Sequence, residues 1–482
     1  MHQMTISNEQ NFDSFKNLIA LCMASLTVTL GFGVILPFFP LYASEILSEV
    51  TLGILIIGIA LQIGIMVSAF TFTRFLLAPI YGDLSDSIGR KPIILVGMSV
   101  YGLVMMGFGF AFDFSTLLFF RALQGVASAA VWPVGEALVV DTSPEEKIGR
   151  NLGYYIVSMQ AGLALGPFAG FFFYTILNEI LGLSEVSSYR LSFICVGVLG
   201  FLATLIIALL VKDPSLSKKI TSTKALYFST FKAMTKKTLE LPKSLYLSLW
   251  RLILHATSRN SITGSENYRN TSIYILYSIA IVTGFCSSMI FPIISLFMAD
   301  YFDLEGGIVA LIIGIVGVLS LIGAPTGGFL SDRIGRKRTV WISELVSGIL
   351  LLLVGLLFDL IALICLFVVQ RFFFTIMRPS FRALQTDLFP NEVRGKEFGI
   401  VQASQNAGSI LGPIIGGVLY DVYFMASFNL GNGVIYSGAG LTFAFSGMLL
   451  IGTSFLLALG INLKRDGINH KQKKVVSTEL AS

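Results

Sequence analysis

The stretch GDLSDSIGRK at residues 82–91 returns as GFLSDRIGRK at residues 328–337, an offset of 246 positions. The register extends beyond this stretch, because Pro133 matches Pro379 and Gly162 matches Gly408 at the same offset. A repeat that keeps one register over about a hundred positions indicates an internal duplication. The chain is therefore built from two structural repeats in the same orientation.

Both repeats lie in a chain that is too apolar for a water-soluble core. Of its 482 residues, 55% are hydrophobic and 13% are charged, whereas soluble domains carry about 25% charged residues. Uncharged stretches reach or exceed the ~20 residues that a spanning helix needs; they are 17–44, 50–73, 92–112, 151–178, 191–211, 270–299, 306–331 and 398–420. Further spans are expected at 115–140, 339–358 and 360–388, which carry charges, and after an outer loop within 422–463.

These apolar runs are continuous rather than alternating, so they predict helices and not a β-barrel. We expect an all-α integral membrane protein with twelve transmembrane helices, arranged as two six-helix bundles related by a pseudo-twofold axis along the membrane normal. The predicted parts are an N-terminal segment (1–15), the first bundle (16–212), a basic linker (213–270), the second bundle (271–463) and a tail (464–482). The linker is expected to lie partly as an amphipathic helix on the anionic inner leaflet, with a disordered basic linker as the alternative.

The distribution of basic residues predicts the orientation in the membrane. When the 33 Lys and Arg residues are assigned to alternating sides, Arg190 falls on one side, a few lie inside spans and the rest share the other side. The positive side faces the cytoplasm. We therefore expect a multi-pass protein of the plasma or inner membrane with both termini cytoplasmic.

The sequence contains few residues that could form a catalytic or metal site. The four cysteines form no CxxC pair and fall inside predicted spans, and no phosphate-binding loop of a nucleotide-driven pump is present. We expect a secondary transporter of a small solute that needs no cofactor beyond a proton gradient, binds no nucleic acid and acts as a monomer. A membrane-embedded enzyme and a non-transporting sensor are the competing classes.

Charged side chains inside spans are costly in lipid, so each is expected to face the transport pathway or a partner. With one glutamine they are Arg74, Arg121, Gln124, Glu136, Glu344, Arg371, Arg378 and Arg382. Five arginines against two glutamates hint at acidic or neutral solutes. All three histidines lie outside the spans, so the proton carrier is expected to be Glu136 or Glu344.

Two pairings are open for Glu136. Arg382 occupies the matching position in the second repeat, and a salt bridge between them would close the cytoplasmic mouth. Alternatively Glu136 pairs with Arg74 inside the first repeat, which leaves Arg382 to Glu344.

The repeated stretch predicts a conformational latch at the inner helix ends. A short glycine-bounded loop can hold Asp86 against a neighbouring helix N-terminus, and Arg90 can pair with Asp141, with Arg336 and Asp387 repeating the pair. The latch residues are Gly82, Asp86, Gly89, Arg90, Lys91, Asp141, Asp332, Arg336 and Asp387. The alternative is that these charges only direct insertion.

A second repeated pattern consists of small residues and prolines, which let helices approach closely and bend. These expected helix-packing hinges are Gly162, Gly166, Pro167 and Gly170 in the first repeat, and Gly408, Gly412, Pro413 and Gly416 in the second.

These motifs resemble the major facilitator superfamily, and the resemblance covers essentially the whole chain. Residues 82–91 look like its loop motif, although Asp83 and Ser87 depart from the usual residues. The 162–170 pattern is similar to the signature of its antiporters, and Pro37 and Pro40 fit the drug/proton antiporter branch. Arg121 in RALQG (121–125) resembles its helix 4 arginine motif, which implies proton coupling or substrate contact.

The resemblance implies secondary transport by alternating access, with proton-coupled export of drugs or metabolites. Because the glycine pattern occurs in both repeats, it can also be a packing device of the duplication. Proton-coupled uptake of an organic anion or a sugar is the alternative.

Overall fold

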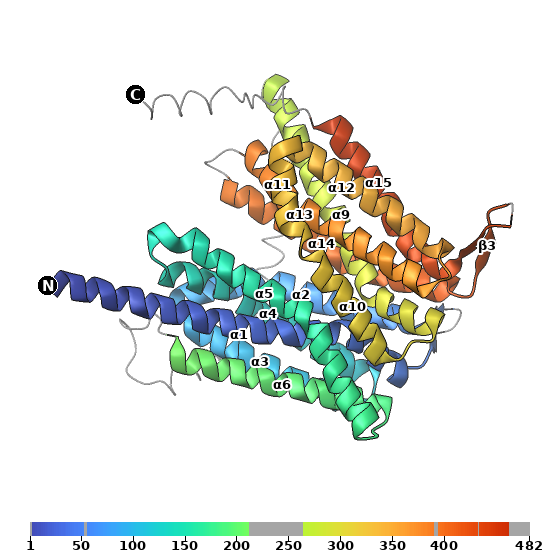
Figure 1. Cartoon of the computed structure of the whole chain (residues 1–482), viewed down its shortest axis with the longest axis horizontal. Helices are drawn as coiled ribbons and strands as arrows, with labels where there is room; N and C mark the ends of the chain where they lie inside the picture. The colour runs from blue at the N-terminus through green and yellow to red at the C-terminus, as the bar shows by residue number, and fades with distance from the viewer. Residues whose placement is uncertain (1, 53–54, 212–263, 390–393, 432, 462–482) are drawn as a thin grey trace. The chain divides into compact units, whose positions relative to one another are not determined.

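The computed structural model describes residues 2–52, 55–211, 264–389, 394–431 and 433–461, and most of them are helical (Figure 1). The first repeat contains α1 (His2–Ile46), α2 (Ile59–Ile88), α3 (Arg90–Gly109), α4 (Phe114–Thr142), α5 (Ile148–Thr175) and α6 (Glu185–Leu210). The second contains α9 (Gly264–Phe302), α10 (Gly306–Ser320), α11 (Gly323–Ile334), α12 (Arg336–Leu353), α13 (Leu360–Leu388), α14 (Arg394–Tyr423) and α15 (Leu441–Gly460). The predicted linker helix and tail lie outside the described residues.

Among the described helices, 11 are long and apolar enough to cross a membrane. α10 and α11 form one of these spans, from Gly306 to Ile334. The remaining predicted span corresponds to α14, which has 30 residues but carries polar side chains such as Gln402, Gln405 and Asn406. These helices agree with the predicted all-α membrane fold.

The predicted span 50–73 is wrong in its bounds. Residues Val50–Leu52 (β1) and Leu55–Ile57 (β2) pair as an antiparallel hairpin, and α2 begins only at Ile59 and continues to Ile88. Lack of charge marked an apolar segment, but the β-branched residues before Gly58 favour a hairpin over a helix. A second hairpin, Ser427–Asn429 (β3) with Ile435–Ser437 (β4), forms the predicted outer loop before α15.

The glycine-bounded loop predicted at 82–91 is mostly helical. α2 continues through Asp83 and Asp86 to Ile88, and α3 starts at Arg90, so Gly89 alone separates them. Gly89 has a φ of 112°, and its counterpart Gly335 has a φ of 96°. Side chains with a Cβ rarely adopt these values, which explains the glycine at both turns.

The helices form two compact units, which are described separately. The first unit contains α1–α6 with the C-terminal parts of α9 and α14 and most of α10; the second contains the rest of α9 and α14, α11–α13 and α15. In the first unit α1 packs along α5, α2 along α4 and α3 along α6. Buried rings such as Phe38, Tyr42, Phe108 and Phe193 fill its core.

Arg190 was the one basic residue predicted on the outer side. Its Nε donates a hydrogen bond to Tyr42 Oη at 3.2 Å, and Nη2 donates to the Ala111 carbonyl at 3.4 Å. Arg190 thus ties α6 to α1 and to the turn after α3.

Candidate functional site

The Arg90–Asp141 ion pair joins the start of α3 to the end of α4, as predicted. The Arg90 guanidinium also contacts Asp86 Oδ1 at 3.2 Å, so Asp86 near the end of α2 pairs with the first residue of α3. Arg336 and Asp387 repeat the pair between α12 and α13, where Arg336 Nη1 also donates to the Ala383 carbonyl at 3.0 Å. Asp332 is exposed. The pairs are present in both repeats; their role as a latch stays a prediction.

The lysines of the repeated motif have partners that sequence reasoning missed. Lys91 Nζ donates to the carbonyls of Ala208 at 2.9 Å and Val211 at 2.6 Å, at the end of α6. Lys337 makes the same contacts at the end of α15, with Ala458 at 2.7 Å and Ile461 at 2.6 Å. Each lysine caps a helix C-terminus, where unpaired carbonyls concentrate negative charge.

The glycine pattern marks helix contacts, as expected. A Cβ on Gly166 would lie 2.4 Å from Gly33 Cα, and one on Gly162 would lie 2.1 Å from Thr29 Oγ1, so α1 and α5 meet backbone to backbone. In the second repeat a Cβ on Gly408 would lie 1.9 Å from the Ile281 carbonyl of α9. Pro167 and Pro413 lie within continuous helices, α5 and α14.

Arg121 is the most deeply placed of the predicted arginines, at 6% exposed. Its guanidinium carbon lies 3.3 Å from the Phe39 ring centroid and 5.5 Å from that of Phe108. Nη1 donates to Gln124 Oε1 at 3.0 Å. Within the described part of the chain no carboxylate forms an ion pair with Arg121.

Arg74, Trp132 and Glu136 gather on α2 and α4. The Arg74 guanidinium lies 4.9 Å from the Trp132 ring centroid, and the Glu136 carboxylate attracts it electrostatically. This arrangement agrees with the Arg74–Glu136 alternative. Glu136 is exposed in this unit, so the predicted Glu136–Arg382 gate stays a prediction.

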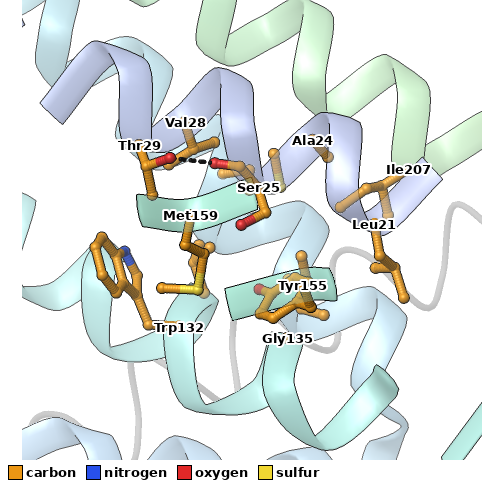
Figure 2. Close-up of a pocket in the computed structure, with 13 residues that line it drawn as sticks. Leu21, Ala24, Ser25, Val28, Thr29, Trp132, Gly135, Tyr155, Met159 and Ile207 are labelled. Carbon is orange, nitrogen blue, oxygen red and sulfur yellow. Dashed lines mark hydrogen bonds between the residues drawn. The ribbon is translucent and has the colours of Figure 1, made fainter. Parts of the chain in front are cut away.

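A small hollow of about 20 Å³ lies beside this group and is lined by residues of α1, α3, α4, α5 and α6. Figure 2 shows Trp132 at one end of it and Leu21 and Ile207 at the other. Most of its lining is apolar, with the hydroxyls of Ser25, Thr29 and Tyr155 as polar groups. This lining favours apolar groups over a sugar.

Glu344 on α12 is buried at 1% exposed. Oε1 accepts a hydrogen bond from Thr453 Oγ1 of α15 at 3.3 Å, while Oε2 has no partner within the described segments. The suggested Glu344–Arg382 pair is therefore wrong. Arg382 instead lies 5.0 Å from the Phe398 ring centroid.

The other second-repeat arginines were expected to face the transport pathway or a partner, and this stays a prediction. Arg371 is half-buried, with its guanidinium carbon 6.0 Å from the Phe374 ring centroid, and Arg378 is exposed. Helical spacing put these residues on one face, but it could not tell how far each side chain reaches into solvent.

A contact between distant parts of the chain escaped sequence reasoning altogether. Asp421, near the end of α14, accepts backbone hydrogen bonds from Ala60 N at 3.0 Å and Leu61 N at 2.8 Å, at the start of α2. A Cβ on Gly58 would lie 2.2 Å from Asp421 Cγ, so this approach requires glycine. Ser68 Oγ donates to the Ile410 carbonyl at 2.6 Å further along the same two helices. Asp421 thus caps α2 from the other repeat.

The described ranges contain no group of three or more His, Cys, Asp and Glu side chains that could hold a metal ion. The ion-paired turns, the close glycine contacts and the buried charges lie on helices long and apolar enough to cross a membrane. The Major Facilitator Superfamily sequence model matches residues 21–264 and 276–472. The chain belongs to this superfamily of multi-pass membrane transporters.

Similar sequences carry drug-resistance names. The chain is 25% identical over 434 residues to the quinolone resistance protein NorA of Staphylococcus aureus strain COL, covering 88% of this chain and 95% of NorA. It is 24% identical over 440 residues to multidrug resistance protein 2 of Bacillus subtilis strain 168, covering 90% and 96%.

Solved structures agree on the fold. A bacterial homologue of the human lysosomal transporter Spinster, in an inward-facing and occupied conformation, matches with a TM-score of 0.66 at 15% identity, covering 92% of this chain and 94% of that one. A crystal structure of the nucleoside transporter NupG matches with a TM-score of 0.66 at 13% identity, covering 92% and 100%.

Proposed function

We propose that this chain exports small amphiphilic solutes from the cytoplasm, driven by the proton gradient, through alternating access. The support is the similarity over nearly the whole length to proteins named for quinolone and multidrug resistance. The apolar hollow beside Trp132 is consistent with an amphiphilic solute.

The proposed setting follows from the charge distribution. The protein acts as a monomer in the plasma or inner membrane, with both termini in the cytoplasm and the basic segments near the anionic inner leaflet. It uses no cofactor and binds no nucleic acid.

The observation that carries proton coupling is the environment of Glu344. A carboxylate that is buried beside two hydroxyls and no cation is unstable as an ion, so it stays neutral until water or a cation reaches it. Thr453 of α15 supplies one hydrogen bond, and Thr283 of α9 is a second hydroxyl beside the carboxylate. When a conformational change opens this packing, water reaches the carboxylate. The proton then leaves toward the side of the membrane to which the packing has opened. Glu344 is therefore the proposed proton carrier, in preference to the exposed Glu136.

The test measures flux in proteoliposomes with an imposed pH gradient, using ethidium and norfloxacin as solutes. The intact chain should accumulate solute against its gradient, and reversing the pH gradient should reverse the direction. Glu344→Gln should abolish accumulation but retain exchange of labelled for unlabelled solute, because a permanently neutral side chain can still cycle.

Glu397→Gln is the matched control. Glu397 is also buried in the same unit, but Tyr277 Oη donates a hydrogen bond to its carboxylate. The Glu397→Gln variant should still accumulate solute. Accumulation that survives in Glu344→Gln would reject Glu344 as the carrier, and absence of flux of every solute in the intact chain would favour a sensor. Uptake of organic anions only, in the opposite direction, would favour the alternative transporter.

A further inference from the structure

We propose that Tyr101, Arg121, Gln124 and Ser128 form a site in the first repeat that binds the carboxylate of an aromatic solute. The proposal rests on the transport function above and names the class of solute that this side of the protein recognises. Each of these side chains is at most 6% exposed.

The four side chains leave hydrogen-bonding capacity unused. Arg121 Nε, Gln124 Nε2, Tyr101 Oη and Ser128 Oγ are all buried and have no hydrogen-bond partner among the described residues. The Gln124 carbonyl oxygen is already taken by Arg121. Arg121 Nε and Gln124 Nε2 can only donate, and each hydroxyl can donate as well as accept, so all four groups could donate to one anion. A guanidinium without an anionic partner and polar groups without hydrogen bonds are costly in a buried site, and an anion would satisfy them together.

The four residues lie at the same level of two adjacent helices. Gly97 of α3 faces Ala127, Ala130 and Val131 of α4, and Gly107 faces Phe120. Because α3 and α4 run antiparallel, Tyr101 lies between these levels, beside residues 121–128. Its hydroxyl is within electrostatic reach of the Arg121 guanidinium.

The duplication provides an internal comparison. At the offset of 246, Tyr101 corresponds to Ser347, Gln124 to Gln370, Arg121 to Phe367 and Ser128 to Phe374. In the second repeat Gln370 Nε2 donates to Ser347 Oγ at 2.8 Å. There the polar pair satisfies itself and Phe367 stands in place of the arginine, so the fold does not require an open donor group at this place. The first repeat differs from this closed arrangement. It carries the Arg121 guanidinium and two hydroxyls that have no hydrogen-bond partner among the described residues.

Aromatic rings adjoin the donors and connect them to the hollow. The Phe32 ring stacks on Tyr101 with centroids 5.2 Å apart and meets Trp132 edge-on at 5.3 Å. Trp132 also lines the hollow (Figure 2). Met98 and Val131 line it too, each one helical turn from the donor group. The hollow is too small for a ring as it stands, so a flat aromatic acid would enter by displacing Phe32 and place its ring beside Trp132, with its carboxylate toward Arg121. Movement of Phe32 would open the connection.

The charge of the site selects the anion. One guanidinium and three neutral groups match a singly charged, planar acceptor, and two guanidinium nitrogens can engage the two carboxylate oxygens. A dianionic phosphate would leave one charge uncompensated. Chloride fits the charge but cannot use the aromatic walls.

The experiment measures equilibrium binding of 9-anthracenecarboxylate and of its methyl ester to the full-length chain in nanodiscs, without a pH gradient. The acid should bind at least tenfold more tightly than the ester. Tyr101→Phe and Ser128→Ala should each weaken acid binding about tenfold, which corresponds to one hydrogen bond, and leave ester binding unchanged. Arg121→Gln should weaken acid binding about a hundredfold.

Ser347→Ala is the matched control, because it changes the equivalent position of the self-satisfied pair. It should leave the preference for the acid intact. Equal binding of acid and ester by the intact chain, or acid binding that Tyr101→Phe and Ser128→Ala do not alter, would overturn the proposal. The proposal would also be overturned if chloride displaces the acid and the affinity does not depend on the anthracene ring. That result would indicate a chloride site.

Failure of this proposal and failure of the transport proposal are separable. If the chain exports ethidium and norfloxacin under a pH gradient but does not discriminate acid from ester, transport stands and the carboxylate site falls. If acid binding is selective and no solute moves, the site stands and the transport proposal falls.

Discussion

Replacement of Asp421 should loosen the contact between α14 and the start of α2. The Asp421 carboxylate accepts hydrogen bonds from Ala60 N and Leu61 N, and Gly58, the residue that precedes α2, makes no side-chain cap of its own. Loss of a helix N-cap costs about 1 kcal/mol, and loss of a negative charge at a helix N-terminus costs about 0.3–1 kcal/mol. Asp421→Ala should therefore weaken the contact by about 1–2 kcal/mol, a factor of about 5–30 in population. Asp421→Asn should cost less, since its amide oxygen still accepts one bond.

The assay follows the exposure of Ser68, which is buried in the first unit and bonded to Ile410 of α14. Ser68→Cys, in a background without the four native cysteines, should react with a maleimide about 5–30 times faster when Asp421→Ala is added, because the α2–α14 contact opens more often. Thr175→Ala is the matched control. Thr175 occupies the equivalent position in the first repeat, and its buried hydroxyl has no partner in the described chain. Equal labelling rates with and without the Asp421→Ala change, at equal expression, would refute this reasoning.

Three further predictions follow from the charges. Cysteine at position 48 should label from outside and cysteine at position 222 only from inside; outside labelling of position 222 would reject the topology. Arg90→Ala should impair transport more than insertion, because it breaks the ion pairs with Asp86 and Asp141 while the apolar spans remain; transport at the normal rate and expression would remove the latch role. Exchanging Arg74 and Glu136 as Arg74→Glu with Glu136→Arg should recover transport that each single change loses; recovery instead by Glu136→Arg with Arg382→Glu would support the gate between repeats.

Several distinctive features of this transporter lie at positions where the two repeats have different residues. Met98, which lines the hollow, corresponds to the buried Glu344, and Thr175 corresponds to Asp421. The shared positions, such as Arg90 and Arg336, make the same ion pairs in both repeats. The duplication supplies a symmetric scaffold, and isolated polar substitutions make the two halves chemically different.

The family, the helical membrane fold and the Arg90–Asp141 and Arg336–Asp387 pairs could be predicted from the sequence alone. These features depend on apolar runs longer than the bilayer is thick, and on spacing within one repeat, both of which are local properties. Sequence reasoning also found Arg121 and Glu344, since a charge inside an apolar run is conspicuous.

Only the tertiary structure decided which of those charges are buried and what surrounds them. Glu136 and Glu344 looked equivalent along the chain, yet one is exposed and the other is sealed between α12 and α15. The unpaired donors of Tyr101 and Ser128, and the cap that Asp421 places on α2, depend on contacts between helices. Residues that are 360 positions apart meet there, as in the Asp421–Leu61 hydrogen bond. Periodicity within a helix carries no information about its neighbour's rotation, so hydrogen-bond satisfaction is settled only when the helices pack.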